Sequence, residues 1–129
     1  MNCSPFAWKD ESIPFLSCSK WEDLPHGFYG IEAELHNENF QLALKKIAKN
    51  RGISRIFDLE QVHSASLVDL RDPLALSQFV ESQTAPIAIR LKADGFLLSR
   101  SARSGLGFAV KSADCVPIIL RDSENIALI

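Results

Sequence analysis

Two residues with side chains suited to metal binding or nucleophilic attack stand out in this sequence, Cys115 and His63. Cys115 lies between Ser-Ala-Asp at 112–114, which interrupts an apolar strand, and the apolar residues 116–120, at an expected strand–turn–strand junction. His63 follows a strand-like segment, residues 55–62. A cysteine beside an apolar run is often a buried core thiol, but thiolate and imidazole also bind zinc or form an activated nucleophile. The two residues alone leave a zinc site and a cysteine–histidine pair open.

Three further polar residues could belong to the same site. Asp114 directly precedes Cys115, and because a carboxylate has no obvious place in a plain core, it is a candidate acid–base group. His26, in Pro-His-Gly-Phe, is typical of a turn before a strand, and His36 is expected to be a solvated loop residue. Neither histidine has metal-ligand spacing to His63 and Cys115.

Composition places the chain among globular proteins. Its 129 residues are 47% hydrophobic and 23% charged, which suits a single domain over residues 1–129. The net charge of -2 and the scattered Lys and Arg residues exclude a basic footprint for nucleic acid. No apolar run approaches the ~20 residues of a membrane-spanning helix, and the N-terminus lacks the apolar core of a signal peptide. We therefore expect a cytoplasmic protein that binds neither nucleic acid nor membranes.

The cysteines agree with that location. Cys3, Cys18 and Cys115 are an odd number at unrelated spacings, which is unlike a secreted disulfide framework. Reduced thiols are the expected state.

Two helices must help to position the candidate site. Residues 39–51 carry apolar side chains at three- and four-residue spacing, and Gly52 follows where a helix would end. A second helix is predicted over residues 72–83, because Asp can cap it and Pro suits its first position. Its expected buried side consists of Leu74, Leu76, Phe79 and Val80.

The remaining regular segments read as strands, and residues 1–30 are predicted to be irregular. The expected strands cover residues 55–62, 66–70, 87–91, 95–99, 107–111, 116–121 and 126–129. The predicted fold class is α+β, a mixed β-sheet with two helices packed on it, as part of a larger α/β sandwich. The candidate site is expected where strand ends meet.

The last two strands should form a hairpin. Residues 122–125, Asp-Ser-Glu-Asn, are turn residues at hairpin length, and an apolar strand follows them up to Ile129. Chain ends usually lie at the surface and are seldom apolar strands. We therefore expect these residues to be the N-terminal part of a longer protein.

Five short motifs together resemble the YfiH/laccase-domain family. They are Pro-His-Gly-Phe at 25–28, Leu-Glu-Gln-Val-His at 59–63, Ala-Asp-Gly at 93–95, Gly-Leu-Gly-Phe-Ala-Val at 105–110 and Ser-Ala-Asp-Cys-Val-Pro at 112–117. They occur in the family's order and cover roughly the first half of a family member. The family was once described as polyphenol oxidases and is now understood as purine nucleoside phosphorylases with adenosine deaminase activity. The resemblance implies that His63 and Cys115 are zinc ligands, with a third ligand beyond Ile129.

The same resemblance implies purine nucleosides and phosphate as substrates of the intact protein. For deamination, zinc would activate a water that attacks the carbon bearing the amino group, and Asp114 would handle protons. For phosphorolysis, cationic side chains would hold the phosphate. The candidates flanking the motif strands are Arg90, Lys92, Arg100, Arg103 and Lys111.

Three other functions remain open at this point. Cys115 could be a thiolate nucleophile activated by His63, as in cysteine hydrolases. A copper-dependent polyphenol oxidase is a second alternative, although three dispersed histidines suit copper less well than zinc. The third is a non-catalytic binding fragment, because without a third ligand the chain itself would be inactive.

Overall fold

The computed structural model describes residues 4–30, 40–84, 90–102, 105–112 and 115–129. The chain divides into two compact units, Met1–Ile53 and Ser54–Ile129, and each is described by itself. Within the described ranges, no helix is both long and apolar enough to cross a membrane. The prediction of one domain over residues 1–129 stays a prediction.

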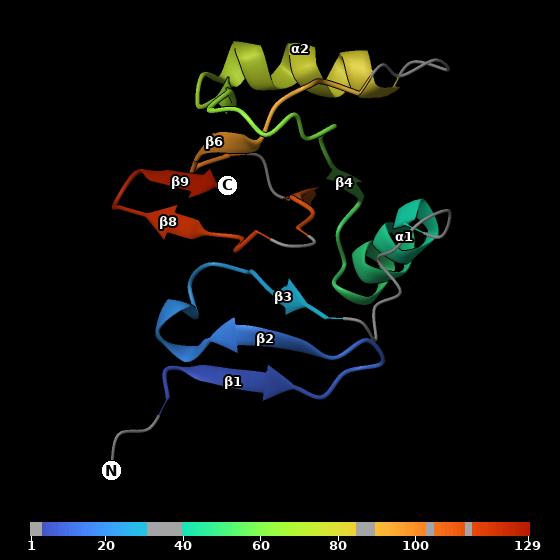
Figure 1. Cartoon of the computed structure of the whole chain (residues 1–129), viewed down its shortest axis with the longest axis vertical. Helices are drawn as coiled ribbons and strands as arrows, with labels where there is room; N and C mark the ends of the chain where they lie inside the picture. The colour runs from blue at the N-terminus through green and yellow to red at the C-terminus, as the bar shows by residue number, and fades with distance from the viewer. Residues whose placement is uncertain (1–3, 31–39, 85–89, 103–104, 113–114) are drawn as a thin grey trace. The chain divides into compact units, whose positions relative to one another are not determined.

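The first unit begins with a small antiparallel sheet of order β1-β2-β3, drawn in blue in Figure 1. Its strands are β1 (Phe6–Lys9), β2 (Phe15–Cys18) and β3 (Phe28–Tyr29), and a 3-10 helix, η1 (Ser19–Trp21), follows β2. The prediction that residues 1–30 are irregular was wrong. Strands of two to four residues are too short to show the alternation from which a strand is recognised.

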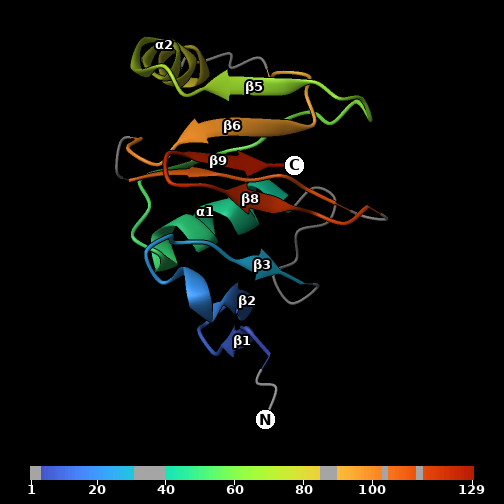
Figure 2. The same cartoon turned by 90° about the vertical axis from the view of Figure 1, so that its left-hand side faces the viewer.

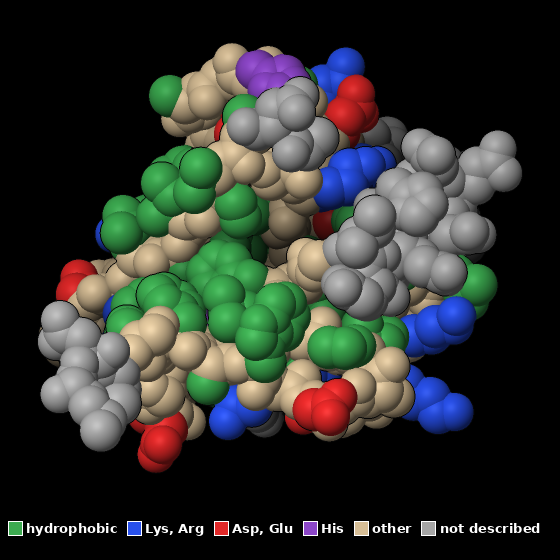
Figure 3. Space-filling view, turned by 60° about the horizontal axis from the view of Figure 1, so that its bottom comes forward, with side chains coloured by type: hydrophobic (Ala, Val, Ile, Leu, Met, Phe, Trp, Pro, Cys, Tyr) green, Lys and Arg blue, Asp and Glu red, His purple; other side chains and the backbone are tan. Residues whose placement is uncertain are grey.

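Aromatic side chains hold this unit together and also reach its surface. Phe15 is buried against Tyr29, with ring centroids 5.2 Å apart. Phe6 and Trp8 lie two residues apart on β1 and remain 46% and 64% exposed. Figure 3 brings the β1–β3 end of the view in Figure 1 forward and shows hydrophobic side chains gathered on that surface.

The first predicted helix is confirmed as α1 (Phe40–Asn50). Its buried residues are the ones that the spacing predicts: Phe40, Ala43, Leu44, Ile47 and Ala48. Gly52 adopts a positive φ of 64°, and the N–H groups of Gly52 and Ile53 donate to the carbonyls of Lys49 and Ala48. This is the Schellman arrangement, in which glycine ends a helix without steric cost.

The second unit contains a four-stranded mixed sheet of order β5-β6-β9-β8 (Figures 1 and 2). Its strands are β5 (Leu67–Leu70), β6 (Gly95–Ser99), β8 (Ile119–Arg121) and β9 (Asn125–Leu128). β5 and β6 are parallel, whereas β9 is antiparallel to both β6 and β8. The α+β class is confirmed, and so is the β8–β9 hairpin, whose turn residue Asp122 accepts hydrogen bonds from the N–H groups of Glu124 and Asn125.

A second, two-stranded sheet in this unit pairs β4 (Arg55–Phe57) with β7 (Leu106–Phe108) in parallel. Both strands are shorter than predicted, as is β8. The predicted strand 87–91 falls mostly outside the described residues, and Arg90 and Leu91 are not in a strand.

The second predicted helix is confirmed as α2 (Pro73–Thr84), beside β5 (Figure 2). The Asp72 carboxylate caps it by accepting a hydrogen bond from Ala75 N–H at 3.0 Å. Leu76 and Phe79 are buried as predicted, and Val80 packs partly against the core. The assignment of Leu74 to the buried side was wrong, because Leu74 is 65% exposed. Two residues along a helix correspond to about 200°, so Leu74 and Leu76 cannot share a face.

Four phenylalanine rings form the centre of the second unit. Phe96, on β6, is fully buried, and its ring lies 6.1 Å from that of Phe79 and 5.1 Å from that of Phe108. Phe57 completes the cluster, 5.2 Å from Phe79. Burying one such ring contributes roughly 1.5–3 kcal/mol. The cluster therefore fixes β6, and Asp94 directly precedes this strand, two residues before Phe96.

Candidate metal centre

The segment that carries His63 forms a loop beside the start of β6. Glu60 pairs in parallel with Lys92, and Leu67 pairs with Gly95. From 60 to 67 the chain advances seven residues, while its partner advances only three, from 92 to 95. The extra residues between Glu60 and Leu67 cannot pair with residues 92–95 and must loop out of the sheet. Such interruptions of a sheet often re-aim a side chain beside a functional site.

The carboxylate of Asp94 fills this loop. Its Oδ1 accepts hydrogen bonds from the backbone N–H of Val62 at 2.9 Å and of His63 at 2.8 Å. Its Oδ2 accepts from the N–H and the hydroxyl of Ser64, both at 2.7 Å. In return, Asp94 N–H donates to Ser66 C=O at 2.9 Å. Three successive backbone amides thus converge on one carboxylate.

This arrangement has consequences for both charge and backbone. The hydrogen bond from the Ser64 hydroxyl, with those from the Ser64, Val62 and His63 amides, lowers the pKa of Asp94 to about 2. His63 has φ 55°, the only positive φ found at a described residue other than glycine. That conformation is uncommon for residues with a Cβ and is found at functional sites that stabilise it. His63 itself is exposed, so its imidazole stays accessible while its backbone is held.

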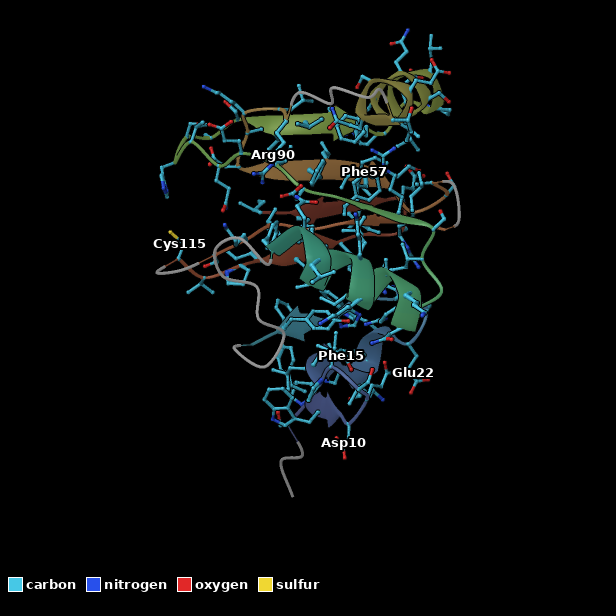
Figure 4. All side chains as sticks on the ribbon, turned by 90° about the vertical axis from the view of Figure 1, so that its right-hand side faces the viewer. Asp10, Phe15, Glu22, Phe57, Arg90 and Cys115 are labelled. Atoms are coloured by element: carbon cyan, nitrogen blue, oxygen red, sulfur yellow. The ribbon has the colours of Figure 1, made fainter. Side chains whose placement is uncertain are left out.

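Cys115 lies on the segment that leads into β8. Its thiol is free, and the residue is exposed, which rules out the buried core thiol. The Ser112 hydroxyl donates to the Cys115 carbonyl, and Val116 is 80% exposed. Figure 4 shows the Cys115 side chain projecting outward, away from Phe57 in the core. Regular pairing resumes only at Ile118, which exchanges two backbone hydrogen bonds with Ile129.

The strand register brings both segments to one end of the four-stranded sheet. β5 and β6 start there, because Leu67 pairs with Gly95, while β9 ends and β8 starts there, because Leu128 pairs with Ile119. Figure 2 shows the loop before β5 and the chain leading into β8 extending beyond this same end. β5 and β8 are the two outermost strands, about 14 Å apart at about 4.8 Å per strand. His63 and Cys115 therefore share an end of the sheet, on opposite flanks.

Comparison with models of protein families matches residues 29–128 to the family described as multi-copper polyphenol oxidoreductase laccase. The chain belongs to this family. The motif resemblance is thereby confirmed over most of the sequence. No curated protein and no solved structure matches the chain.

The match places the His63 and Cys115 motifs of the laccase family inside the aligned region, and leaves His26 outside it. His26 has a structural role: its Nε2 accepts from Cys18 N–H at 2.8 Å and its Nδ1 bonds the Leu24 carbonyl at 2.7 Å. With both ring nitrogens engaged, His26 is not a ready metal ligand. Asp114, the predicted proton carrier, and His36 lie outside the described residues.

The described residues hold no cluster of three or more His, Cys, Asp and Glu side chains that could bind a metal. The laccase-family match covers both candidate ligands but does not test either of them. The assignment of His63 and Cys115 as zinc ligands stays a prediction.

The described cations among the five predicted to hold phosphate do not share one contact site. Arg90 forms an ion pair with Asp58. Arg100 bonds the carbonyls of Asp122 and Ser123 at the hairpin, at the opposite end of the sheet from His63. An open depression lies at that opposite end too, lined by Arg71, Ser99, Arg100, Ser101, Ser123, Glu124 and Asn125.

Lys92 lies opposite Glu60, before the His63 loop; it is 69% exposed and has its Nζ 3.9 Å from Glu60 Oε1. Lys111 is exposed, and Arg103 lies outside the described residues.

Sequence reasoning did not single out Asp94, whose carboxylate accepts four hydrogen bonds from residues 62–64. The Ala-Asp-Gly motif marks its position, but the motif alone indicates only a turn before a strand. Its bonding to residues 62–64 depends on the long-range pairing of β5 with β6. The serine after His63 is a second signal, because a hydroxyl can share the same carboxylate.

Proposed function

We propose that the protein, as a complete family member, is a zinc-dependent enzyme that acts on purine nucleosides by phosphorolysis or deamination. One observation carries the proposal: an exposed imidazole on a stabilised left-handed backbone and an exposed thiol extend from the same end of one sheet. The membership of the laccase family agrees with an enzyme. The purine substrates come from the motif resemblance.

The donor chemistry fits zinc. Zinc accepts imidazole nitrogen and thiolate sulfur, and a catalytic zinc commonly has three protein ligands and one open position. His63 and Cys115 would supply two of them, and the third would come from outside residues 1–129. β9 lies between β6 and β8 and ends at this same end of the sheet.

The chain's own residues would then divide the work. When bound, zinc would supply an activated water for attack on the amino-bearing carbon of a purine. His63 and Cys115 would orient it, and Asp114 would carry the proton. For phosphorolysis, Lys92 suits phosphate binding better than Arg100, because Lys92 lies at the His63 end of the sheet, whereas Arg100 lies at the other.

A multi-copper oxidase, the activity in the family's description, has less support in these residues. Copper oxidation centres use several histidine ligands, and the sequence contains three histidines. His26 has both ring nitrogens in hydrogen bonds. The donor set therefore favours zinc with mixed nitrogen and sulfur ligands.

The cysteine-nucleophile alternative needs Cys115 and His63 in direct contact. Such pairs work at about 2.6–3.2 Å, whereas these two residues extend from opposite flanks of the sheet. A bound metal supplies free energy for drawing two flanking segments together. A cysteine–histidine pair has no comparable source.

The test uses the full-length protein and four forms: wild type, His63→Ala, Cys115→Ala and, as a control thiol, Cys18→Ala. We expect about one zinc per chain and turnover of inosine or adenosine in wild type and Cys18→Ala, and loss of both in the other two. Stoichiometric zinc that persists in Cys115→Ala would refute the ligand assignment. Alkylation of Cys115 that abolishes turnover of a metal-free protein would establish the nucleophile instead.

A further inference from the structure

The direction of the His63 side chain depends on a carboxylate that is distant in sequence. We infer that Asp94 is a positioning residue for His63. Its carboxylate holds residues 62–64 in one backbone conformation. In this conformation the imidazole is presented at the end of the sheet where β5 and β6 start. This inference rests on the proposed function, since it assigns His63 a metal to meet.

The first argument is the geometry of the loop. Regular pairing stops at Glu60 and resumes at Leu67, so the ladder between strands does not fix residues 62–64. The backbone N–H groups of residues 62–64 donate to the Asp94 carboxylate instead. Successive amides that converge on one anion form a nest, a conformation that alternates right- and left-handed residues. The left-handed φ of 55° falls on the middle residue, His63.

The second argument is the firm support of Asp94 itself. Its neighbours Ala93 and Gly95 are buried, and its N–H donates to Ser66 C=O. Ala93 N–H donates to Glu60 C=O at 3.1 Å, which ties the segment before Asp94 to the segment before the loop. The carboxylate is thus attached to the core, and the loop is attached to the carboxylate. The position of the imidazole follows from this chain of contacts.

The bonding pattern predicts a graded response to substitution. Asp94→Ala removes all four acceptor contacts. Asp94→Asn keeps one acceptor oxygen, which suits Val62 and His63, but places an NH₂ group where Ser64 N–H and Oγ–H must donate. Ser64→Ala removes the hydroxyl contact to Asp94 and the hydrogen bond that Ser66 N–H donates to Ser64 Oγ at 3.1 Å, but keeps all three backbone amides on the carboxylate.

Asp122 provides a matched control. Its Oδ1 accepts hydrogen bonds from the N–H groups of Glu124 and Asn125, both at 2.7 Å, so it too organises a loop through backbone amides. It belongs to the same sheet, but to the β8–β9 turn at the end away from His63. Asp122→Ala should therefore loosen a loop without affecting a metal bound at the other end.

The experiment measures zinc affinity by calorimetry in the full-length protein, with amide hydrogen exchange of residues 62–64 recorded without metal. Relative to wild type, we expect Asp94→Ala to weaken zinc binding about 10- to 100-fold, the usual effect of losing a group that orients a ligand. Asp94→Asn and Ser64→Ala should fall between, in that order. Asp122→Ala should bind zinc as wild type does. Exchange at residues 62–64 should accelerate in the same order as the affinity falls.

The His63→Ala variant separates the two ideas. If His63→Ala loses zinc while Asp94→Ala binds it as tightly as wild type, the positioning inference is overturned and the zinc site stands. If wild type binds no zinc, or His63→Ala binds it unchanged, the proposed function fails and the inference fails with it. Should Asp94→Ala not fold, unchanged affinity in both Asp94→Asn and Ser64→Ala would equally overturn the inference.

Discussion

The His63 loop and the Cys115 segment offer the same sheet end two different kinds of ligand. Four hydrogen bonds to Asp94 hold the backbone of the first, with His63 in a left-handed conformation. In the described part of the second, the Ser112 hydroxyl donates a hydrogen bond to the Cys115 carbonyl. Backbone pairing begins at Ile118, which bonds to Ile129. The backbone of one candidate ligand is held by a distant carboxylate, whereas the described residues around the other show a local hydrogen bond and strand pairing from Ile118 onward.

This difference indicates how the free-energy cost of binding a metal would be distributed. Ordering a residue's backbone costs roughly 1–2 kcal/mol, and a segment already fixed in the free protein avoids that cost on binding. His63 would bring its imidazole in a preset direction, and Cys115 would move to complete the contact. The adjustable side is then the thiol side.

The largest effect should come from removing the core that both segments share. Phe96→Ala deletes the fully buried ring at the centre of the second unit, and we expect a loss of about 3–5 kcal/mol in the free energy of unfolding. Urea unfolding of the full-length protein measures it. Phe6→Ala, at a ring that is 46% exposed, should cost about 0.5 kcal/mol or less. A loss below about 1 kcal/mol for Phe96→Ala would contradict the shared core.

A smaller effect is expected from Gly95→Ala, directly after Asp94. A Cβ at this position would collide with the Leu128 carbonyl and lie 2.9 Å from Leu67 Cδ2. Overpacking of this kind costs about 1–3 kcal/mol, and here it acts where β5, β6 and β9 meet. Amide exchange should rise at residues 62–64 more than at 115–118. Ser99→Ala, at the other end of β6, is the control, and an equal rise in both segments would argue against separate anchoring.

Thiol reactivity can sharpen the contrast between the two segments. Cys115 is exposed and Cys18 is half-buried, so iodoacetamide should modify Cys115 before Cys18 in the metal-free protein. With about nine-tenths of the sites occupied by zinc, modification of Cys115 should slow about tenfold, because a bound thiolate is not free to react. Modification of Cys18 should not change. Equal protection in His63→Ala would show that zinc does not need the imidazole.

The smallest expected effect is that of lowering the pH from 7 to 4 on amide exchange at residues 62–64. The pKa of Asp94 is lowered to about 2, from an ordinary value near 4, because its charged form accepts the four loop hydrogen bonds. A carboxyl with a lowered folded pKa stabilises the fold above its unfolded pKa, and this contribution is lost as the pH falls toward 2. Exchange at residues 62–64 of the metal-free protein, corrected for its intrinsic pH dependence, should stay constant from pH 7 to 4 and rise below. A rise centred above pH 4 would contradict this bonding.

The sequence was most informative where a signal is local. The periodicity and Gly52 predict α1 and its end, the Asp72-Pro73 pair predicts the start of α2, and residues 122–125 predict the hairpin. Each of these depends on residues that are close along the chain. The short strands within residues 6–29 were not predicted, because two to four residues are too few to show an alternation of apolar and polar side chains.

For the candidate site, the sequence could predict which residues belong to it but not how they are arranged in space. Cys115 and His63 could be singled out by residue type and motif, whereas their common sheet end follows from pairing across β5, β6, β9 and β8. The role of Asp94 was hidden for the same reason, since it is about 30 residues from the amides that it binds. Long-range register, which no local pattern encodes, is what assembles this end of the molecule.

X-ray absorption at the zinc edge of the full-length protein tests the central claim, that His63 and Cys115 bind one zinc, most directly. The account predicts one sulfur ligand at about 2.3 Å together with imidazole nitrogen at about 2.0–2.1 Å. The sulfur contribution should vanish in Cys115→Ala and persist in Cys18→Ala, and the imidazole contribution should diminish in His63→Ala. A zinc environment without sulfur in wild type, or one that keeps its sulfur in Cys115→Ala, would contradict the account.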